Sequence, residues 1–278
     1  MFSEEHKKLL LDLFHIYAPS GNEKPLLDYI KNFLNLAKIP FEQDDNGNII
    51  CMNHKGAPLL SSHTDCVGGA EAGYYIDFVD IYPYGDDEIV KGFGNIGADD
   101  KCGVFLILLY LLTGKPINVI FSIEEEVGGL KGITQVLSEI KDNEVFKSIP
   151  YCLVLDRKNS GDIICNKNDY GTKDFENALA EIGKKYNYEP ALGSICDMNK
   201  IKEYMNGCNL SVGYYNPHSD KEFFSLKSLY NTWNYINDII DNLPRDIPSK
   251  NDLAPVDPVP PVPQVQSKEK FVVVQDEV

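Results

Sequence analysis

The sequence lacks the features that define several large classes of protein. Its longest apolar run, residues 104–112, is much shorter than the roughly twenty residues that a membrane-spanning helix needs. Basic residues are scarce: 26 lysines and arginines face 42 acidic residues, the formal net charge is −16, and no basic stripe is visible. We therefore expect neither a membrane-embedded protein nor one that binds nucleic acid.

Cysteine patterns are also missing. The seven cysteines form no CxxC pair and no zinc-finger spacing, and an odd number, several within apolar runs, is typical of reduced thiols rather than of a disulfide framework. The N-terminal segment MFSEEHKKLLLDLF has no signal-peptide core followed by a cleavage site. These features predict a cytoplasmic protein. Cys66 and Cys102 lie near the ligand candidates described below. They could be soft ligands or a nucleophile, but small buried side chains are the favoured interpretation.

Helical and strand-like patterns alternate along most of the chain. Leucines at helical spacing mark residues 4–18, and Ser20 and Glu23 form an S-x-x-E pattern that predicts a capping box for a second helix reaching residue 37. Further helices are predicted over 101–112, 130–140, 173–187, about 198–206 and about 222–242. Strands are predicted over 49–53, 58–62, 118–123, 151–155, 162–166 and 208–215, with a loop or short hairpin over 70–95.

This alternation predicts an α/β protein with a single three-layer domain, residues 1–243, in which helices cover a mainly parallel central sheet. A length of 278 residues suits one sizeable hydrophobic core. Residues 244–278 are rich in proline and lack helical periodicity, which predicts a flexible, disordered tail. The PVPPVP segment of the tail is suited to an aromatic-lined groove, so a protein partner could bind it.

Five short segments end strand-like runs with side chains that bind metal ions: SSHTD, GADDK, SIEEEVG, LVLDR and YYNPHS. The candidate residues are His63, Asp65, Asp99, Asp100, Glu125, Glu126, Asp156 and His218. Because ligands bind at the carboxyl edge of open α/β sheets, we expect these side chains to meet there. Imidazoles and carboxylates suit zinc, cobalt or manganese, and two such ions can share one carboxylate beside a free base. The sequence therefore predicts a two-metal hydrolase.

Each segment also has a simpler interpretation when it is considered alone. His63–Asp65 could be a strand-end turn, and Asp99–Asp100 could cap a helix. Glu124–Glu126 could be a solvated run of charges, and Asp156–Arg157 a salt-bridged turn. His218 could be an ordinary polar histidine. Together, and in this order along the chain, the five segments favour the metal site.

The same segments resemble the motifs of the co-catalytic zinc exopeptidases, a clan that includes peptidase T, zinc aminopeptidases, carboxypeptidases and acylamino-acid hydrolases. HTD, GADDK followed by Gly103, EEVG, LVLD and PHS occur in the order of that clan, and the similarity covers roughly residues 5–242. The Val127–Gly128 dipeptide sets the register of the glutamate run and leaves Glu124 as the extra acid.

The resemblance implies a role for each residue. His63 and Asp156 bind a first ion, Glu126 and His218 bind a second, and Asp99 bridges the two. Asp65 orients the imidazole of His63, and Glu125 is the general base on the attacking water. A cis peptide bond between Asp99 and Asp100 is also implied.

Two further positions keep two interpretations each. Asp197 lies in a segment that resembles one that shapes the substrate pocket in the clan, or it caps a helix. Glu222 either supports His218 or favours the N-terminus of the last helix.

By resemblance, the expected activity is cleavage of peptide or amide bonds, and we adopt an aminopeptidase or a di- or tripeptidase as the first interpretation. Short peptides or acylated amino acids are the expected substrates, and two divalent ions, zinc before cobalt or manganese, are the expected cofactors. The alternatives are an amidase or deacylase of N-acyl amino acids or cell-wall peptides, and a non-catalytic binding relative. About sixty residues separate Asp156 from His218, so we expect a compact form without a lid or dimerisation domain.

Overall fold

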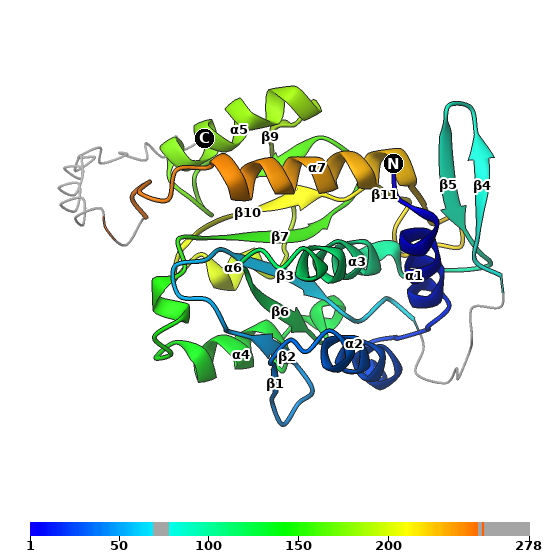
Figure 1. Cartoon of the computed structure of the whole chain (residues 1–278), viewed down its shortest axis with the longest axis horizontal. Coiled ribbons are helices and arrows are strands. Elements are labelled where there is room, and N and C mark those ends of the chain that lie inside the picture. Colours follow the sequence, from blue (N-terminus) through cyan, green and yellow to red (C-terminus); the bar gives the residue numbers. More distant parts are fainter. Residues whose placement is uncertain (69–77, 250–251, 253–278) are drawn as a thin grey trace, which may run out of the picture.

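An eight-stranded sheet forms the centre of the computed structural model, which describes residues 1–68, 78–249 and 252 (Figure 1). Its spatial order is β1-β2-β6-β3-β7-β10-β8-β9. The strands are β1 (Glu42–Gln43), β2 (Ile49–Cys51), β3 (Leu59–His63), β6 (Asn118–Ser122), β7 (Tyr151–Arg157), β8 (Asp162–Ile164), β9 (Glu189–Ala191) and β10 (Asn206–Ser211). Strands β6, β3, β7 and β10 are mutually parallel, whereas β1, β2 and β8 join through antiparallel pairings. The predicted mainly parallel sheet is confirmed.

Helices cover both faces of this sheet and complete the predicted three-layer α/β fold (Figure 1). They are α1 (Glu4–Phe14), α2 (Lys24–Leu36), α3 (Ala98–Leu112), α4 (Ile133–Ile140), α5 (Lys173–Gly183), α6 (Met198–Ile201) and α7 (Leu226–Asn242), with 3-10 turns η1 (Glu125–Val127), η2 (Phe146–Ser148) and η3 (Lys184–Tyr186). One hydrophobic core joins the sheet to α1, α2, α3, α5 and α7, and a second joins its other face to α4 and α6. Within the described ranges, no helix has the length and apolar character needed to cross a membrane.

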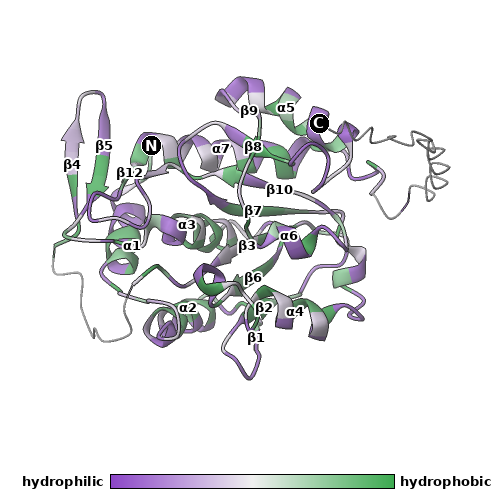
Figure 2. Ribbon diagram, turned by 180° about the vertical axis from the view of Figure 1, so that it is seen from behind, coloured by the Kyte–Doolittle hydropathy of each residue, from purple (hydrophilic) through white to green (hydrophobic). Residues whose placement is uncertain are grey.

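The apolar runs of the sequence explain why the inner strands form. Every residue of β3 and β6 and the first five of β7 are buried, without the alternation of a half-exposed strand. Such continuous runs are typical of parallel strands that helices cover on both faces. Helix α3 is likewise buried along almost its whole length, and Figure 2 shows hydrophobic residues concentrated in this helix and the strands beneath it.

A second, antiparallel sheet of four strands lies beside the first, in the order β11-β12-β5-β4. Its strands are β4 (Asp80–Tyr84), β5 (Asp87–Lys91), β11 (Tyr214–Tyr215) and β12 (Phe223–Ser225). Strands β4 and β5 form the hairpin predicted within residues 70–95; residues 69–77 of that segment lie outside the described residues. Most of the predicted tail, residues 244–278, also lies outside them, so the division into domain and tail stays a prediction.

The predicted capping box of Ser20 and Glu23 is wrong. Helix α2 begins at Lys24, and no side chain caps it. Ser20 instead donates its hydroxyl hydrogen bond to Asp65 Oδ2 at 2.7 Å. Glu23 Oε1 accepts hydrogen bonds from the backbone N–H groups of Gly21, at 2.9 Å, and Glu124, at 3.3 Å. The S-x-x-E pattern is a local signal, but the partners of these side chains include residues far away in the sequence: Asp65 for Ser20 and Glu124 for Glu23.

Several predicted helices are shorter than expected, α6 and α7 among them, and two short edge strands were not predicted. Helix α6 ends at Ile201. Residues 223–225 form β12, which pairs with β5 and β11, so α7 begins only at Leu226 with Ser225 as its cap. Pairing between distant strands thus replaced the first helical turn. Strands β1 and β9 contain only two and three residues, too few for a periodic pattern.

The segment between Asp156 and His218 leaves no room for an additional domain. It contains β8, α5, η3, β9, α6, β10 and β11, which belong to the two sheets or pack on them. All residues of this segment are described. The predicted compact form without a lid domain is therefore confirmed for this part of the chain.

Candidate metal centre

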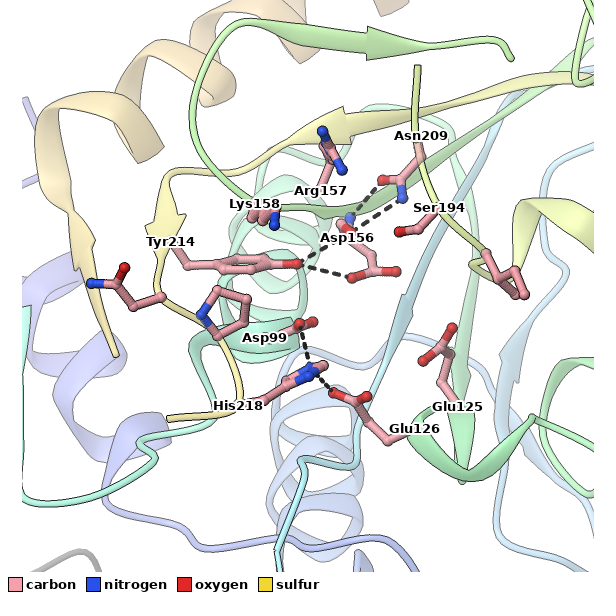
Figure 3. A pocket seen from close by; sticks show the side chains of 14 residues that line it. Asp99, Glu125, Glu126, Asp156, Arg157, Lys158, Ser194, Asn209, Tyr214 and His218 are labelled. Carbon is pink, nitrogen blue, oxygen red and sulfur yellow. Dashed lines mark hydrogen bonds and ion pairs between the residues drawn. The ribbon is translucent and has the colours of Figure 1, made fainter. Parts of the chain in front are cut away.

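The carboxyl ends of three parallel strands bring the predicted ligands to one place (Figure 3). His63 is the last residue of β3, Asp156 is the last but one of β7, and the turn η1 with Glu125 and Glu126 follows β6. Parallel register places these ends at the same edge of the sheet, where such folds bind ligands. Asp99, at the start of α3, and His218, in the loop between β11 and β12, complete the group.

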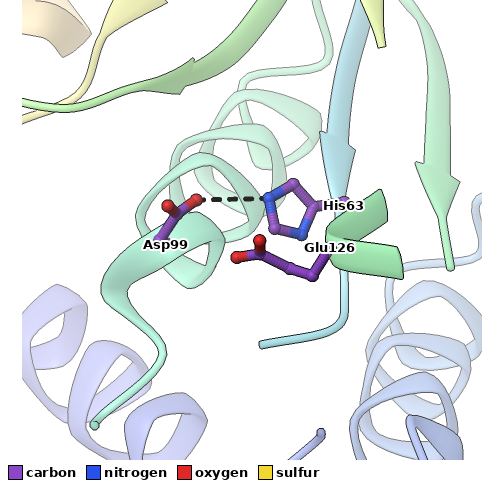
Figure 4. A group of neighbouring side chains, drawn as sticks. All are labelled: His63, Asp99 and Glu126. Carbon is purple, nitrogen blue, oxygen red and sulfur yellow. Dashed lines mark hydrogen bonds and ion pairs between the residues drawn. The ribbon is translucent and has the colours of Figure 1, made fainter. Parts of the chain in front are cut away.

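The carboxylate of Asp99 lies between two imidazoles. Its Oδ1 is 3.2 Å from Nε2 of His63 and its Oδ2 is 3.1 Å from Nε2 of His218. Figure 4 marks the first contact and Figure 3 the second. Each oxygen therefore faces a different histidine. This is the arrangement that a carboxylate shared between two cations requires. The peptide bond that joins Asp99 to Asp100 is cis, as the resemblance implied.

The candidate ligands form a pair at each histidine, and their potential ligand atoms lie close enough to form overlapping groups. Nε2 of His63 lies 3.6 Å from Asp156 Oδ1, and Nε2 of His218 lies 2.8 Å from Glu126 Oε1. The potential ligand atoms of His63, Asp99 and Glu126 all lie within 4.8 Å of one another, and so do those of His63, Asp100 and Asp156. The structure thus brings the five predicted ligands together; their individual roles stay predictions.

Asp65 links the first imidazole to the glutamate turn. Its Oδ1 lies 3.3 Å from Nδ1 of His63, which leaves Nε2 facing Asp99. The same carboxylate accepts hydrogen bonds from the backbone N–H groups of Glu125, at 2.9 Å, and Glu126, at 3.1 Å. Outer partners of this kind fix the tautomer and orientation of a ligating histidine. Asp65 therefore positions both His63, at the end of β3, and the turn η1, which follows β6.

Glu222 and Asp100 support Asp99 in ways that the sequence did not predict. The helix interpretation of Glu222 is wrong, because α7 begins only at Leu226 and is capped by Ser225. The Glu222 carboxylate accepts hydrogen bonds from the backbone N–H groups of Ala98, at 3.1 Å, and Asp99, at 3.2 Å, and its support of His218 stays a prediction. Asp100 is buried and accepts hydrogen bonds from Ser62 Oγ, at 2.5 Å, and from the Gly103 N–H, at 3.1 Å. Both acids stabilise the start of α3.

Burial and like charge act on the acids of this site. Burial raises the pKa of Asp156 well above its usual value, and the neighbouring charge of Asp99 adds to the effect. Burial also raises the pKa of Glu126, and it raises the pKa of Glu125 to about 7. Crowded carboxylates in a desolvated position need compensating positive charge.

The residues fit divalent cations. Glu126 Oε1 is buried and, within the described part of the chain, has no hydrogen-bond partner, although the His218 imidazole lies close. The donors are imidazole nitrogens and carboxylate oxygens, which suit zinc, cobalt and manganese. Neither Cys66 nor Cys102 belongs to the ligand groups among the described residues, and both are buried free thiols, in agreement with the favoured interpretation.

A cavity of about 460 Å³ opens onto the ligands (Figure 3). Its walls include residues that the sequence did not single out. The Tyr214 hydroxyl lies 3.3 Å from Oδ1 of Asp156, and the amide of Asn209 forms hydrogen bonds with both the backbone N–H and the carbonyl of Asp156. Nothing in their local sequence marks these two positions, because their role depends on β10 and β11 lying beside β7.

Asp197 does not line the cavity of about 460 Å³. Its carboxylate forms no helix cap and instead accepts a hydrogen bond from Ser122 Oγ at 2.6 Å. Together with Glu125 it lines a smaller adjoining cavity of about 60 Å³. Asp197 does stand at the N-cap position of α6, as the helix-cap interpretation expected, but its side chain makes no capping hydrogen bond. A role in shaping the substrate pocket stays a prediction.

Comparison with known sequences gives partial matches. No profile of a known protein family matches this chain. A [LysW]-lysine/[LysW]-ornithine hydrolase of Saccharolobus islandicus is 34% identical over 125 residues, which are 44% of this chain and 32% of the relative. The corresponding hydrolase of Sulfurisphaera tokodaii is 27% identical over 191 residues, 64% of this chain and 51% of the relative. The chain thus spans about a third to a half of the length of these curated relatives.

Comparison with solved structures defines the fold. A tripeptidase from Staphylococcus aureus superposes with a TM-score of 0.67, and aminopeptidase PepT from Bacillus cereus with 0.66; each is 16% identical, and each match covers 86% of this chain and 98% of the other. An aminopeptidase from Desulfurococcus kamchatkensis gives 0.65 at 16% identity, covering 87% and 96%. The chain has the fold of these PepT, tripeptidase and aminopeptidase structures, and the resemblance predicted from its motifs is confirmed.

Proposed function

We propose that this chain is a two-metal hydrolase of peptide or related amide bonds, with an aminopeptidase or a di- or tripeptidase as the first candidate. The observation that carries the proposal is the position of Asp99, whose two carboxylate oxygens face His63 and His218 separately. Asp156 would complete the first ion site and Glu126 the second. When bound, the two ions would polarise the scissile carbonyl and make the attacking water acidic.

Glu125 is the acid that is free to move protons. It lines the cavity but belongs to neither group of potential ligands among the described residues, and Asp65 holds its backbone N–H. In the proposed reaction Glu125 accepts a proton from the attacking water as the water oxygen bonds to the carbonyl carbon. The carbon–nitrogen bond then breaks, and Glu125 returns the proton to the leaving amine.

One observation favours a second candidate, an amidase or deacylase that acts on acylated amino acids. The curated relatives are named for hydrolysis of [LysW]-lysine and [LysW]-ornithine, whereas the structural neighbours are named as peptidases. Both activities need the same two ions and the same base, so the metal centre does not separate them. A panel of aminoacyl-naphthylamides, tripeptides and N-acyl amino acids does.

Replacing Glu125 by glutamine tests the mechanism. Glu125→Gln keeps the size of the side chain but removes the base, so we expect metal content to stay the same while kcat falls by about 10²- to 10⁴-fold. Elemental analysis and steady-state kinetics on the active substrates of the panel measure the two quantities.

Glu124→Gln is the matched control. Its carboxylate pairs with Lys131 at 2.9 Å and does not line the cavity, so this variant should keep its activity. Equal activity of Glu125→Gln and the wild type would remove Glu125 as the base. A purified wild type without divalent ions, and without activity on the panel when they are added, would overturn the proposed function.

A further inference from the structure

The basic side chains that line the cavity of about 460 Å³ differ in whether an acidic side chain holds them. His218 contacts Asp99 and Glu126, and Arg157 holds Asp162 through its Nε at 2.9 Å. Lys158 also lines the cavity and is exposed, but its ammonium has no hydrogen-bond or ion-pair partner among the described residues. Among the basic side chains of the described cavity wall, Lys158 is therefore the one that no acidic side chain holds, and it is available to a ligand.

The backbone that carries Lys158 is fixed. Its carbonyl accepts a hydrogen bond from Ser211 Oγ at 2.9 Å, and the next N–H, of Asn159, donates to the Tyr214 carbonyl at 2.7 Å. Lys158 follows the last residue of β7, two positions after Asp156. Arg157 and Lys158 both line the cavity, but Arg157 meets Asp162 through its Nε, whereas Lys158 has no such partner among the described residues. Figure 3 shows Lys158 and Arg157 on the opposite side of Asp156 from Glu126 and His218.

The acids of the cavity show a complementary pattern. Four carboxylates line it, and three of them, Asp99, Glu126 and Asp156, are proposed metal ligands. The fourth, Glu125, is the proposed base. No acid of the described wall is left to bind the ammonium group of a free substrate N-terminus, whereas an unpaired cation is available for a carboxylate.

We propose that Lys158 binds the free carboxylate of the substrate and so selects amides whose leaving amine is a single amino acid, as in dipeptides and N-acyl amino acids. This inference rests on the proposed function. Two residues of extended chain separate Asp156 from Lys158 by roughly 6.5 Å. A flexible lysine side chain mounted there reaches a carboxylate one residue beyond the scissile bond. The cavity, at about 460 Å³, is in the lower part of the roughly 300–1,000 Å³ range of ligand pockets, which suits so small a substrate.

Matched substrate pairs that differ only in the carboxylate test the proposal. We suggest alanyl-leucine with alanyl-leucinamide, and N-acetyl-leucine with N-acetyl-leucinamide, assayed with the full chain loaded with its divalent ions. The readout is the ratio of kcat/KM for the acid to that for the amide. We expect a ratio of about tenfold or more in the wild type and a fivefold to tenfold fall in Lys158→Met, because one charge-assisted hydrogen bond is lost. Lys158→Arg should keep a larger ratio than Lys158→Met.

The ratio is insensitive to a general loss of folded protein, because both substrates lose activity equally. Lys55→Met is the matched control: Lys55 is exposed, lies outside the cavity, and should leave the ratio at the wild-type value. As a readout without turnover, calorimetry on Glu125→Gln should show tighter binding of N-acetyl-leucine than of its amide. The double variant Glu125→Gln/Lys158→Met should lose this difference.

The outcomes separate the two levels of the proposal. The wild type could cleave both members of a pair without preferring the acid, or Lys158→Met could keep the wild-type ratio. Either result overturns the role of Lys158 but leaves the proposed hydrolase function in place. If the wild type cleaves no member of either pair and none of the wider panel, the proposed function is overturned and the inference with it.

Discussion

The two halves of the candidate metal centre are built differently. His63 lies at the end of a central strand, its side chain is 2% exposed, and Asp65, Asp99 and Asp156 surround it. The side chain of His218 is 45% exposed, and the residue stands in a loop with a positive φ of 61°. Its partner Glu126 comes from a short turn. The first half is therefore fixed by the core of the sheet, whereas the second depends on two connecting segments.

This difference indicates unequal metal sites. A ligand set held by buried strands loses little conformational freedom when an ion binds, while loop ligands must be ordered at that moment. We therefore expect the first ion to bind more tightly than the second. Asp99 belongs to both halves and couples them.

The largest effect is expected from removing the shared carboxylate. Asp99→Ala should lose both ions and reduce turnover to background, because neither half retains a complete ligand set. Elemental analysis of the purified variant, with circular dichroism as the check on folding, measures this result. A folded variant that retains one ion per chain would show that the two halves do not share Asp99.

Removing each histidine in turn separates the halves. His63→Ala and His218→Ala should each release about one ion per chain, but only His63→Ala should strongly destabilise the metal-free protein. Its loss leaves buried carboxylates without their counter-charge, which costs about 3 kcal/mol, whereas the half-exposed His218 pairs contribute under about 1 kcal/mol. Urea denaturation in the presence of a chelator gives both free energies of unfolding. Equal destabilisation would contradict the contrast between the halves.

The smallest effect is expected from the outer support of Asp99. Glu222→Gln keeps one oxygen acceptor for the N–H groups of Ala98 and Asp99 but loses the other, so metal affinity should weaken by about tenfold. Competition with a chelator of known affinity measures the change. Glu189→Gln, at an exposed position of β9, is the control and should bind metal like the wild type. An unchanged affinity in Glu222→Gln would show that the rest of α3 holds Asp99 without it.

The secondary structure could be predicted where the pattern was long and buried. The strands ending at His63 and Asp156 were expected because continuous apolar runs are typical of covered parallel strands. Apart from helix bounds, the predictions that were wrong involve single polar residues such as Ser20, Glu23 and Glu222, which resembled local helix signals. In the fold, Ser20 binds Asp65 and Glu222 binds the start of α3, and these long-range contacts override local propensity.

The sequence by itself determined the types of the candidate ligands, their order and the strands that end in them, because these depend on residue identity and on the short periods of local structure. The tertiary structure decided which oxygen of Asp99 faces which histidine, that Tyr214 and Asn209 enclose Asp156, and that Lys158 faces the cavity without a partner. Those features arise from the register and packing of segments far apart in the chain. No local pattern encodes such contacts, since each exists only when distant strands lie side by side.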